Sequence, residues 1–275
     1  MGTFLCVQVC YDRAMKPRIA IPQAHSTATE YVQRVMPQYF DAIRLGGGEP
    51  VEVPLKADNH EIARLATLCD AVLLPGSRAD VNPEKYDQPR HSKTNPADPL
   101  RDNADELLLQ DAFNMRKPVL GICFGMQILN VWRTGTLMQD IDTVVDHVVR
   151  GIPRAHTVMI DPFSRLASIV AAAAGQTAAL SAGRPLQLTV NSSHHQAAAV
   201  PGDGLRVVAR CPVDNIIEAV EGAVPDHFVL GLQWHPERML DDPASIAIFQ
   251  AFIDAANQRR QHPRTSTPDF ESLSR

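Results

Sequence analysis

A cysteine near the middle of the chain lies where a strand pattern changes into a helix pattern. The four apolar residues 119–122 are typical of a short, fully buried strand. The residues after Cys123 place apolar side chains on one face of a helix: Met126, Ile128, Leu129 and Trp132. Gly121 and Gly125 flank the cysteine two residues away on each side. This order predicts a sharp strand-to-helix turn in which small neighbours make room for the cysteine.

Such a turn would place the side chain of Cys123 at a helix N-terminus, where the helix dipole and free N–H groups favour a thiolate. The pattern follows the Gly-x-Ser-x-Gly nucleophile elbow, with sulfur in place of oxygen. A buried structural cysteine beside a glycine-rich turn fits the same residues equally well. The local pattern therefore needs support from elsewhere in the sequence.

That support comes from a second strand-like run that ends in a histidine. Residues 229–232 are apolar, and His235 and Glu237 follow shortly after them. In an extended segment, residues i and i+2 face the same side, so Glu237 can reach the ring of His235. A cysteine nucleophile needs a base, and the base needs a partner that fixes its tautomer. We predict a catalytic triad of Cys123, His235 and Glu237.

Short apolar runs alternate with helical patterns along the first half of the chain. Strands are expected near 18–22, 50–54 and 71–74, and helices over 37–45, 60–69 and 101–116. This alternation predicts parallel βαβ units, whereas short links between the late runs 205–209, 216–220 and 227–232 predict antiparallel strands. We expect one α/β domain with a mostly parallel central sheet and added antiparallel strands.

Functional sites in such sheets form at the carboxyl ends of strands. Leu74 ends one predicted strand directly before Pro75-Gly76-Ser77, and Ile122 ends another directly before Cys123. The two motifs are expected to meet at the same edge. Backbone N–H groups near Gly76 and at Phe124 are then candidate donors to an oxyanion, although Pro-Gly-Ser taken by itself is more typical of an ordinary turn.

Several motifs together carry a family resemblance that runs from about residue 16 to about residue 255. They are Gly121-x-Cys123-x-Gly125-x-Gln127, His235-Pro236-Glu237, Leu74-Pro75-Gly76-Ser77, Asp98-Pro99-Leu100-Arg101-Asp102 with Glu106, and Asn191-Ser192-Ser193-His194-His195-Gln196. This set resembles the class I glutamine amidotransferases, and within them the γ-glutamyl-γ-aminobutyrate hydrolase (peptidase C26) family. The resemblance implies the flavodoxin-like fold of that superfamily, a small γ-glutamyl substrate and a chain able to form a homodimer.

The resemblance also implies roles for residues around the triad. It assigns substrate binding to Ser77, Gln127, Ser193, His194, His195 and Gln196, and it requires neither a metal nor an organic cofactor. Phe124 departs from the arginine usual after the nucleophile in this branch, which favours an apolar leaving group. γ-Aminobutyrate, another polyamine-derived amine, an aromatic amine and an amino acid all stay open as the amine released.

Three other groups of polar residues have more than one interpretation. The pair His194-His195 suggests a metal site, but adjacent residues point apart in a strand and no acidic cluster accompanies them. Arg101, Asp102 and Glu106 fit the family pattern, and their spacing fits a charged helix surface at least as well. Glu218 matches a family position near the site and equally an outward-facing strand residue.

Composition sets broad limits. The net charge is −5, which favours neither nucleic acid nor an anionic membrane as a partner. Five irregularly spaced cysteines argue against a disulfide framework, and no apolar run has the length of a membrane span. A cytoplasmic location is the resulting expectation. Residues 1–15 are expected to be an N-terminal extension, 16–257 the hydrolase domain and 258–275 a flexible tail.

Two further functions remain open beside a γ-glutamyl amide hydrolase. A glutaminase subunit that passes ammonia to a synthetase would use the same catalytic residues. Pro75-Gly76-Ser77 and the long 77–99 loop are evidence against that alternative. A non-catalytic binding or regulatory relative would have kept the fold and lost the chemistry, which the intact triad disfavours.

Overall fold

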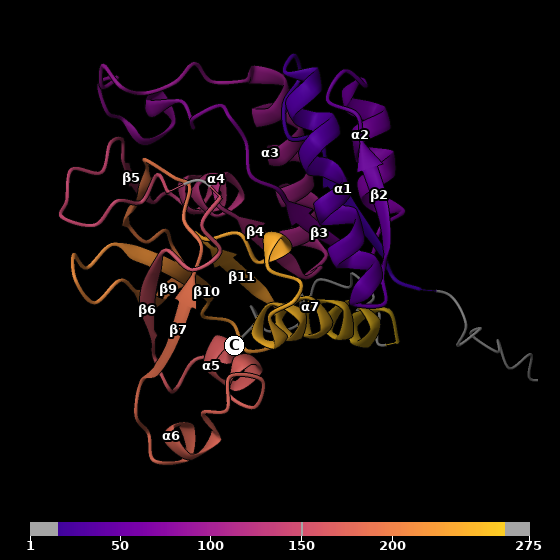
Figure 1. The fold of residues 1–275 in the computed structure, drawn as a ribbon. Helices are drawn as coiled ribbons and strands as arrows, with labels where there is room; N and C mark the ends of the chain where they lie inside the picture. The colour runs from indigo at the N-terminus through magenta and orange to yellow at the C-terminus, as the bar shows by residue number, and fades with distance from the viewer. Residues whose placement is uncertain (1–15, 150, 262–275) are drawn as a thin grey trace, which may run out of the picture.

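The computed structural model describes residues 16–149 and 151–261. Within them, one nine-stranded sheet runs through the molecule in the order β2-β1-β3-β4-β11-β10-β9-β6-β7 (Figure 1). Its strands are β1 (Arg18–Pro22), β2 (Glu49–Val53), β3 (Ala71–Leu74), β4 (Val119–Ile122), β6 (His156–Ile160), β7 (Leu186–Val190), β9 (Leu205–Arg210), β10 (Ile217–Gly222) and β11 (Val229–Leu232). A small second sheet pairs β5 (Thr136–Met138) with β8 (Ala197–Val200).

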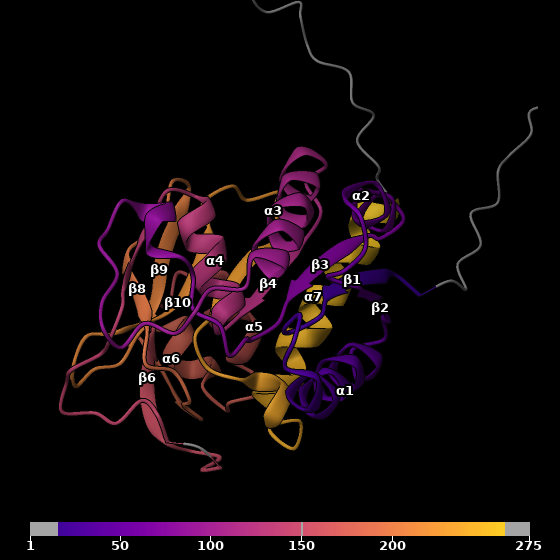
Figure 2. The same ribbon diagram turned by 90° about the horizontal axis from the view of Figure 1, so that it is seen from above.

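The first five strands of the sheet are parallel, as expected from the alternating pattern. The helices divide into two layers (Figure 2). The layer on one face contains α1 (Thr29–Leu45), α5 (Arg165–Val170) and α7 (Pro243–Gln261), and the layer on the other contains α2 (Asn59–Thr67), α3 (Pro99–Asn114) and α4 (Phe124–Trp132). The sheet is therefore covered by helices on both sides.

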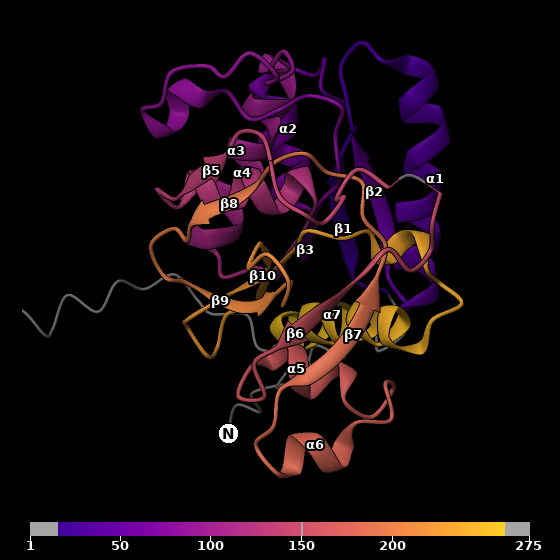
Figure 3. The same cartoon turned by 60° about the vertical axis from the view of Figure 1, so that its left-hand side comes forward.

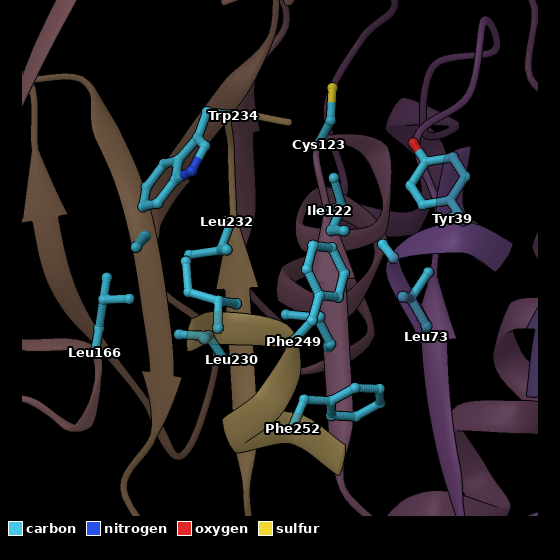
Figure 4. Close-up of a cluster of buried hydrophobic side chains, with 14 of the residues drawn as sticks. Tyr39, Leu73, Ile122, Cys123, Leu166, Leu230, Leu232, Trp234, Phe249 and Phe252 are labelled. Atoms are coloured by element: carbon cyan, nitrogen blue, oxygen red, sulfur yellow. The ribbon is translucent and has the colours of Figure 1, made fainter. Parts of the chain in front are cut away.

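Strand periodicity explains why two separate cores form. In β3, Leu73 packs in the core that includes Phe249 and Phe252 of α7 (Figure 4), whereas its neighbours Val72 and Leu74 pack in the core under α2, α3 and α4. Successive side chains of a strand point to opposite faces, so a strand buried on both faces must be apolar throughout. All four residues of β3 are fully buried.

The second half of the sheet is antiparallel, and for β9, β10 and β11 the short links predicted this. β11 pairs with β10, β10 with β9, β9 with β6, and β6 with β7, each antiparallel. Figure 3 shows β6, β7, β9 and β10 of this half. The short helix α6 (Thr177–Ser181) lies beyond α5 at the end of this half. The strand β8 had no clear signal in its sequence, Ala-Ala-Ala-Val.

Two element boundaries differ from the expectation. Helix α1 begins at Thr29 rather than at Pro37, which lies inside the helix. An interior proline weakens a helix, but here Tyr31, Val35 and Tyr39 recur every four residues and bury one face. At the other end, α7 continues to Gln261, so residues 258–261 are helical rather than the start of a flexible tail. The rest of that tail and the extension over 1–15 lie outside the described residues.

The topology brings three chain segments to one edge of the sheet. β4 lies between β3 and β11 in parallel register, with Ile122 beside Leu232 and Gly121 beside Leu74. The segments that follow Leu74, Ile122 and Leu232 therefore emerge side by side at the carboxyl edge. None of the described helices is long and apolar enough to cross a membrane.

Candidate active site

Cys123 occupies a strained turn between β4 and α4. Its backbone has φ 54° and ψ −107°, a conformation that residues with a side chain rarely adopt. The Cys123 N–H donates to the carbonyl of Leu232 at 2.7 Å, which ties the turn to the end of β11. The side chain lies at the N-terminus of α4, where the first N–H groups, those of Phe124 and Gly125, precede any helical acceptor. The geometry matches the sharp turn predicted from the sequence.

The two flanking glycines are required by close backbone contacts. A Cβ on Gly121 would lie 2.6 Å from the carbonyl oxygen of Gly125, and a Cβ on Gly125 would lie 2.0 Å from that of Leu74. Both distances are far below van der Waals contact, and both involve backbone that cannot rotate away. The glycines allow α4 to turn back directly against β3 and β4, which fixes Cys123 at the edge of the sheet.

His235 is positioned just after β11 by a double hydrogen bond to one side chain. Asn191 accepts from the His235 N–H at 2.8 Å and donates its amide to the His235 carbonyl at 2.7 Å. The imidazole is 2% exposed, and its Nδ1 lies 2.7 Å from Oε1 of Glu237. Glu237 makes this contact from a 3₁₀ turn over Pro236–Arg238, and not from the extended segment that the sequence argument assumed.

The electrostatics of this pair favour a protonated imidazole. Burial alone would lower the pKa of His235, but the Glu237 carboxylate and interactions with Cys123 outweigh it and raise the pKa to about 9. Burial alone would raise the pKa of Glu237, but His235 and Arg238 hold that pKa below its ordinary value. An imidazolium beside a cysteine stabilises the thiolate form, which is the nucleophilic species.

The backbone around Gly76 approaches the same point from β3. A Cβ on Gly76 would lie 3.1 Å from His235 Cε1, 3.1 Å from the Tyr39 hydroxyl oxygen and 3.7 Å from Cys123 Cβ. The Gly76 N–H donates to the Tyr39 hydroxyl at 3.0 Å. Because that oxygen accepts from Gly76, the tyrosine O–H is oriented to donate elsewhere.

Comparison with known proteins identifies the family. A sequence profile described as Peptidase C26 matches residues 17–237. The chain belongs to the peptidase C26 family. A γ-glutamyl-γ-aminobutyrate hydrolase of Escherichia coli K12 is 30% identical to it over 236 residues, which cover 81% of this chain and 86% of that protein. A Mycobacterium tuberculosis protein provisionally named as a glutamine amidotransferase is 37% identical over 221 residues, which cover 80% of this chain and 66% of that protein.

The fold likeness extends further than the sequence likeness. A solved structure from Thermoplasma acidophilum, provisionally named as a GMP synthase subunit, superposes with a TM-score of 0.55 at 15% identity, over 90% of this chain and 96% of that one. At this identity the likeness concerns the fold alone. It confirms the expected class I glutamine amidotransferase fold for this peptidase C26 chain.

The sequence motifs assign no role to Tyr39. The four-residue spacing of Tyr31, Val35 and Tyr39 does indicate a buried helix face. Figure 4 shows its hydroxyl at the same end of the strands as the Cys123 sulfur. Burial raises the pKa of Tyr39 well above its ordinary value, so the hydroxyl keeps its proton at neutral pH. Tyr39 is therefore a candidate oxyanion donor in this peptidase C26 site, beside the backbone groups of Gly76 and Phe124.

Of the other residues assigned to substrate binding, Ser77 and Ser193 lie beside the triad segments. Ser193 accepts from Arg238 at 3.0 Å, and Ser77 accepts from the N–H of Ala79 at 3.1 Å within its own turn. Arg238 also forms an ion pair with Glu237 at 3.3 Å. Substrate contact by either serine stays a prediction.

The remaining assigned residues form hydrogen bonds or ion pairs with other protein groups. Gln127 is buried and donates to the carbonyl of Gln196 and to the side chain of Gln233. Gln196 is buried and donates to the carbonyl of Gln139. His195 is partly exposed and pairs with Asp80 in the 77–99 loop, and His194 points into a separate buried cluster. Their binding roles also remain predictions.

Two sequence-based interpretations are wrong. The ring of Phe124 is buried against the guanidinium of Arg101, with 4.9 Å from Cζ to the ring centroid, so it does not favour an apolar leaving group. Arg101 does not belong to a charged helix surface, because it is fully buried and pairs with Asp105 at 2.8 Å. It also donates to the carbonyls of Ala24 and Pro75, which holds the Gly76 turn in place.

Replacement of Glu237 by glutamine should move the titration of His235. Without the carboxylate, burial dominates and the pKa of His235 falls from about 9 toward or below its ordinary value. Activity that needs the protonated ring should be lost at lower pH than in the wild type, and kcat should drop on the order of 10²- to 10⁴-fold. A pH–rate profile with NMR titration of the imidazole measures both effects.

The control for this variant is Glu61→Gln, which removes an exposed carboxylate paired with Arg64. The same titration affects fold stability. The contribution of protonated His235 to the free energy of unfolding should be fully present below about pH 6.5 and should disappear as pH rises through about 9. If the alkaline limb of the pH–rate profile is unchanged in Glu237→Gln, the carboxylate does not control the pKa of His235.

Proposed function

We propose that the protein is a cysteine-dependent hydrolase that cleaves the γ-amide bond of a γ-glutamyl amine, releasing glutamate and the amine. The observation that carries the proposal is the position of Cys123 in a strained turn beside the buried His235–Glu237 pair. This arrangement supplies a nucleophile, a proton carrier and an orienting carboxylate at one edge of the sheet. Membership in the peptidase C26 family supports an amide hydrolase.

The proposed reaction has two stages. The Cys123 thiolate attacks the γ-carbonyl carbon and forms a tetrahedral oxyanion, which the Phe124 N–H and the Tyr39 hydroxyl stabilise, while the Gly76 N–H holds that hydroxyl in place. Protonated His235 gives its proton to the amine nitrogen as the C–N bond breaks, which leaves a glutamyl thioester. The neutral histidine then takes a proton from water, and the resulting attack on the thioester releases glutamate and the thiolate.

Positive charge near the triad suits the carboxylate that every γ-glutamyl group carries. The Arg238 side chain is 34% exposed next to Glu237 and Ser193. Arg78, two residues after Gly76, is exposed, with its guanidinium 4.9 Å from the centroid of the Tyr31 ring. These guanidinium groups are candidates to hold the α-carboxylate, since arginine binds carboxylates by paired hydrogen bonds.

The substitution Tyr39→Phe should slow the chemical step. The change leaves the buried ring in place, but it removes one oxyanion donor and the acceptor of the Gly76 N–H. We expect kcat to fall on the order of 10²-fold, with a smaller change in KM. The matched control is Tyr86→Phe, because the Tyr86 hydroxyl is also buried and has no hydrogen-bond partner among the described residues. Equal kinetics for the two variants would remove Tyr39 from the oxyanion site.

Glutamate release from a panel of amides tests the proposed function. The panel contains γ-glutamyl-γ-aminobutyrate, γ-glutamyl amides of a diamine, an aromatic amine and an amino acid, and free glutamine. We expect release from one or a few γ-glutamyl amides and little from glutamine. Release from glutamine alone would favour an ammonia-donating glutaminase, and no release from any compound would favour a non-catalytic relative.

A further inference from the structure

A second cluster of ionisable side chains lies in the antiparallel half of the sheet. His147 lies in the segment between β5 and β6, His156 begins β6, His194 follows β7, and Glu218 lies in β10. The side chains of His147, His194 and Glu218 are at most 2% exposed. The His147 ring centroid lies 4.9 Å from that of His194 and 4.7 Å from that of His156. Nothing in the proposed hydrolysis uses this cluster.

Hydrogen bonds on the outer side of two rings fix where their lone pairs point. Nε2 of His147 lies 2.8 Å from Oδ2 of Asp214, and Nδ1 of His194 lies 2.9 Å from the carbonyl oxygen of Gln196. Both partners are acceptors, so in each neutral ring this nitrogen carries the hydrogen. The lone pairs therefore sit on Nδ1 of His147 and Nε2 of His194. Metal-binding histidines usually have their second nitrogen fixed by a carboxylate or a carbonyl in this way.

The inner nitrogens of His147 and His194 face the carboxylate of Glu218, whose Oε1 also lies 2.9 Å from Nε2 of His156. Nδ1 of His147 lies 3.4 Å from Oε1 of Glu218, and Nε2 of His194 lies 3.9 Å from the same oxygen. Neither nitrogen has a hydrogen-bond partner among the described residues, and neither does Oε2 of Glu218. Two imidazole lone pairs and a carboxylate oxygen that lie together without partners of their own would repel one another unless a positive charge lies among them.

The spacing of these atoms fits a metal ion. The ligand atoms of His147, His194 and Glu218 all lie within 4.8 Å of one another. Bonds of about 2.0–2.1 Å to a tetrahedral zinc ion place neighbouring ligands about 3.3 Å apart. The separation of 3.4 Å between His147 and Glu218 matches this value, and the 3.9 Å separation to His194 is a few tenths of an ångström longer.

We propose that His147 Nδ1, His194 Nε2 and the Glu218 carboxylate bind one divalent cation of the zinc type. Two imidazoles and one carboxylate suit Zn²⁺ and its transition-metal neighbours better than Mg²⁺ or Ca²⁺, which prefer oxygen ligands. His156 Nε2 lies 2.9 Å from Oε1 of Glu218 and would orient that carboxylate. The proposal departs from the sequence-based expectation of no metal, which treated His194 and His195 as a pair.

The cation would hold together the loop that positions His235. Ser192 donates its hydroxyl to the His147 carbonyl at 2.9 Å, and the His194 N–H donates to the same carbonyl at 2.8 Å. Asn191, at the start of this loop, makes the double hydrogen bond to His235. A metal that joins His147 and His194 to β10 thus stabilises the segment behind the triad without touching substrate.

Cobalt binding tests the proposal on the full-length chain. We would measure the zinc content of protein purified without chelator, then strip it and titrate Co²⁺ while recording visible absorption. We expect about one zinc ion per chain and one Co²⁺ site whose visible bands disappear when Zn²⁺ is added. His194→Gln should abolish these bands, whereas His195→Gln should retain them, because His195 pairs with Asp80 and Asp140 outside the cluster.

A milder variant keeps the test decisive where His194→Gln fails to fold. Asp214→Asn leaves all three ligands in place and removes only the carboxylate behind His147, so it should weaken Co²⁺ binding about 10- to 100-fold. No bound zinc and no cobalt bands in the wild type would overturn the proposal, and would favour a neutral, protonated Glu218 that donates within the cluster. A cobalt–thiolate band lost in Cys211→Ala or Cys123→Ala would also overturn it, by placing the metal elsewhere.

Discussion

Replacement of Cys123 by alanine is expected to abolish glutamate release. Removal of the nucleophile from a triad enzyme costs on the order of 10⁶-fold in kcat, because the remaining groups cannot form the covalent intermediate. The alanine side chain is smaller and fits the space that the sulfur leaves in the turn. Thermal unfolding should therefore stay close to that of the wild type. The measurement is glutamate release under single-turnover and steady-state conditions.

Cys69→Ala is the matched control for this variant. Cys69 is also buried, but it lies at the end of α2, and burial raises the pKa of its thiol to about 11. A thiol of that kind is not a nucleophile at neutral pH, so its removal should leave kcat unchanged. Wild-type turnover in Cys123→Ala, or loss of turnover in Cys69→Ala, would show that another group performs the chemistry.

Replacement of Arg101 by methionine should strongly destabilise the fold. Its guanidinium forms a fully buried ion pair with Asp105 and donates to the carbonyls of Ala24 and Pro75. Methionine fills part of the volume but leaves the Asp105 charge uncompensated, which typically costs about 3–5 kcal/mol of unfolding free energy. Denaturant unfolding at neutral pH measures this loss.

The pH dependence of that loss separates charge from packing. Burial raises the pKa of Asp105 to about 6 even with Arg101 present, and loss of the guanidinium should raise it further. A buried carboxyl with a raised pKa makes the fold progressively less stable as pH rises from its ordinary pKa to the raised one. The deficit of Arg101→Met should therefore be largest well above pH 6, and it should shrink as pH falls toward about 6, where Asp105 becomes protonated in both proteins. Arg64→Met, which removes an exposed ion pair with Glu61, should change the stability little, because solvent screens that pair. Equal effects at both arginines would contradict the buried-pair interpretation.

The sequence predicted the sheet and the cysteine turn because their signals are local. The run 119–122, its flanking glycines and the helical spacing after Cys123 each reflect contacts with near neighbours in the chain. The predicted start of α1 is wrong because proline is typical of a helix start, whereas the spacing of Tyr31, Val35 and Tyr39 correctly indicates a helix that begins earlier. Burial of that face against the sheet supplies the free energy that an interior proline removes.

Other features of the site depend on contacts between distant residues. Arg101 fits an exposed helix surface by its spacing with Asp102 and Glu106, and only packing against Pro75 and Phe124 makes it a buried residue. The histidine cluster depends even more on distant contacts, because β10 brings Glu218 next to side chains from three other segments. The adjacent pair His194-His195 does not indicate it, because those two rings point to different partners.

Detection of a glutamyl thioester on Cys123 tests the central claim most directly. The γ-glutamyl amide with the highest turnover would be mixed with enzyme, quenched in acid within the first turnovers and examined by intact-protein and peptide mass spectrometry. We predict a mass increase of one glutamyl group on the peptide that contains Cys123, and none in Cys123→Ala. Glutamate release without any adduct on Cys123, or an adduct on another residue, would contradict the proposed mechanism.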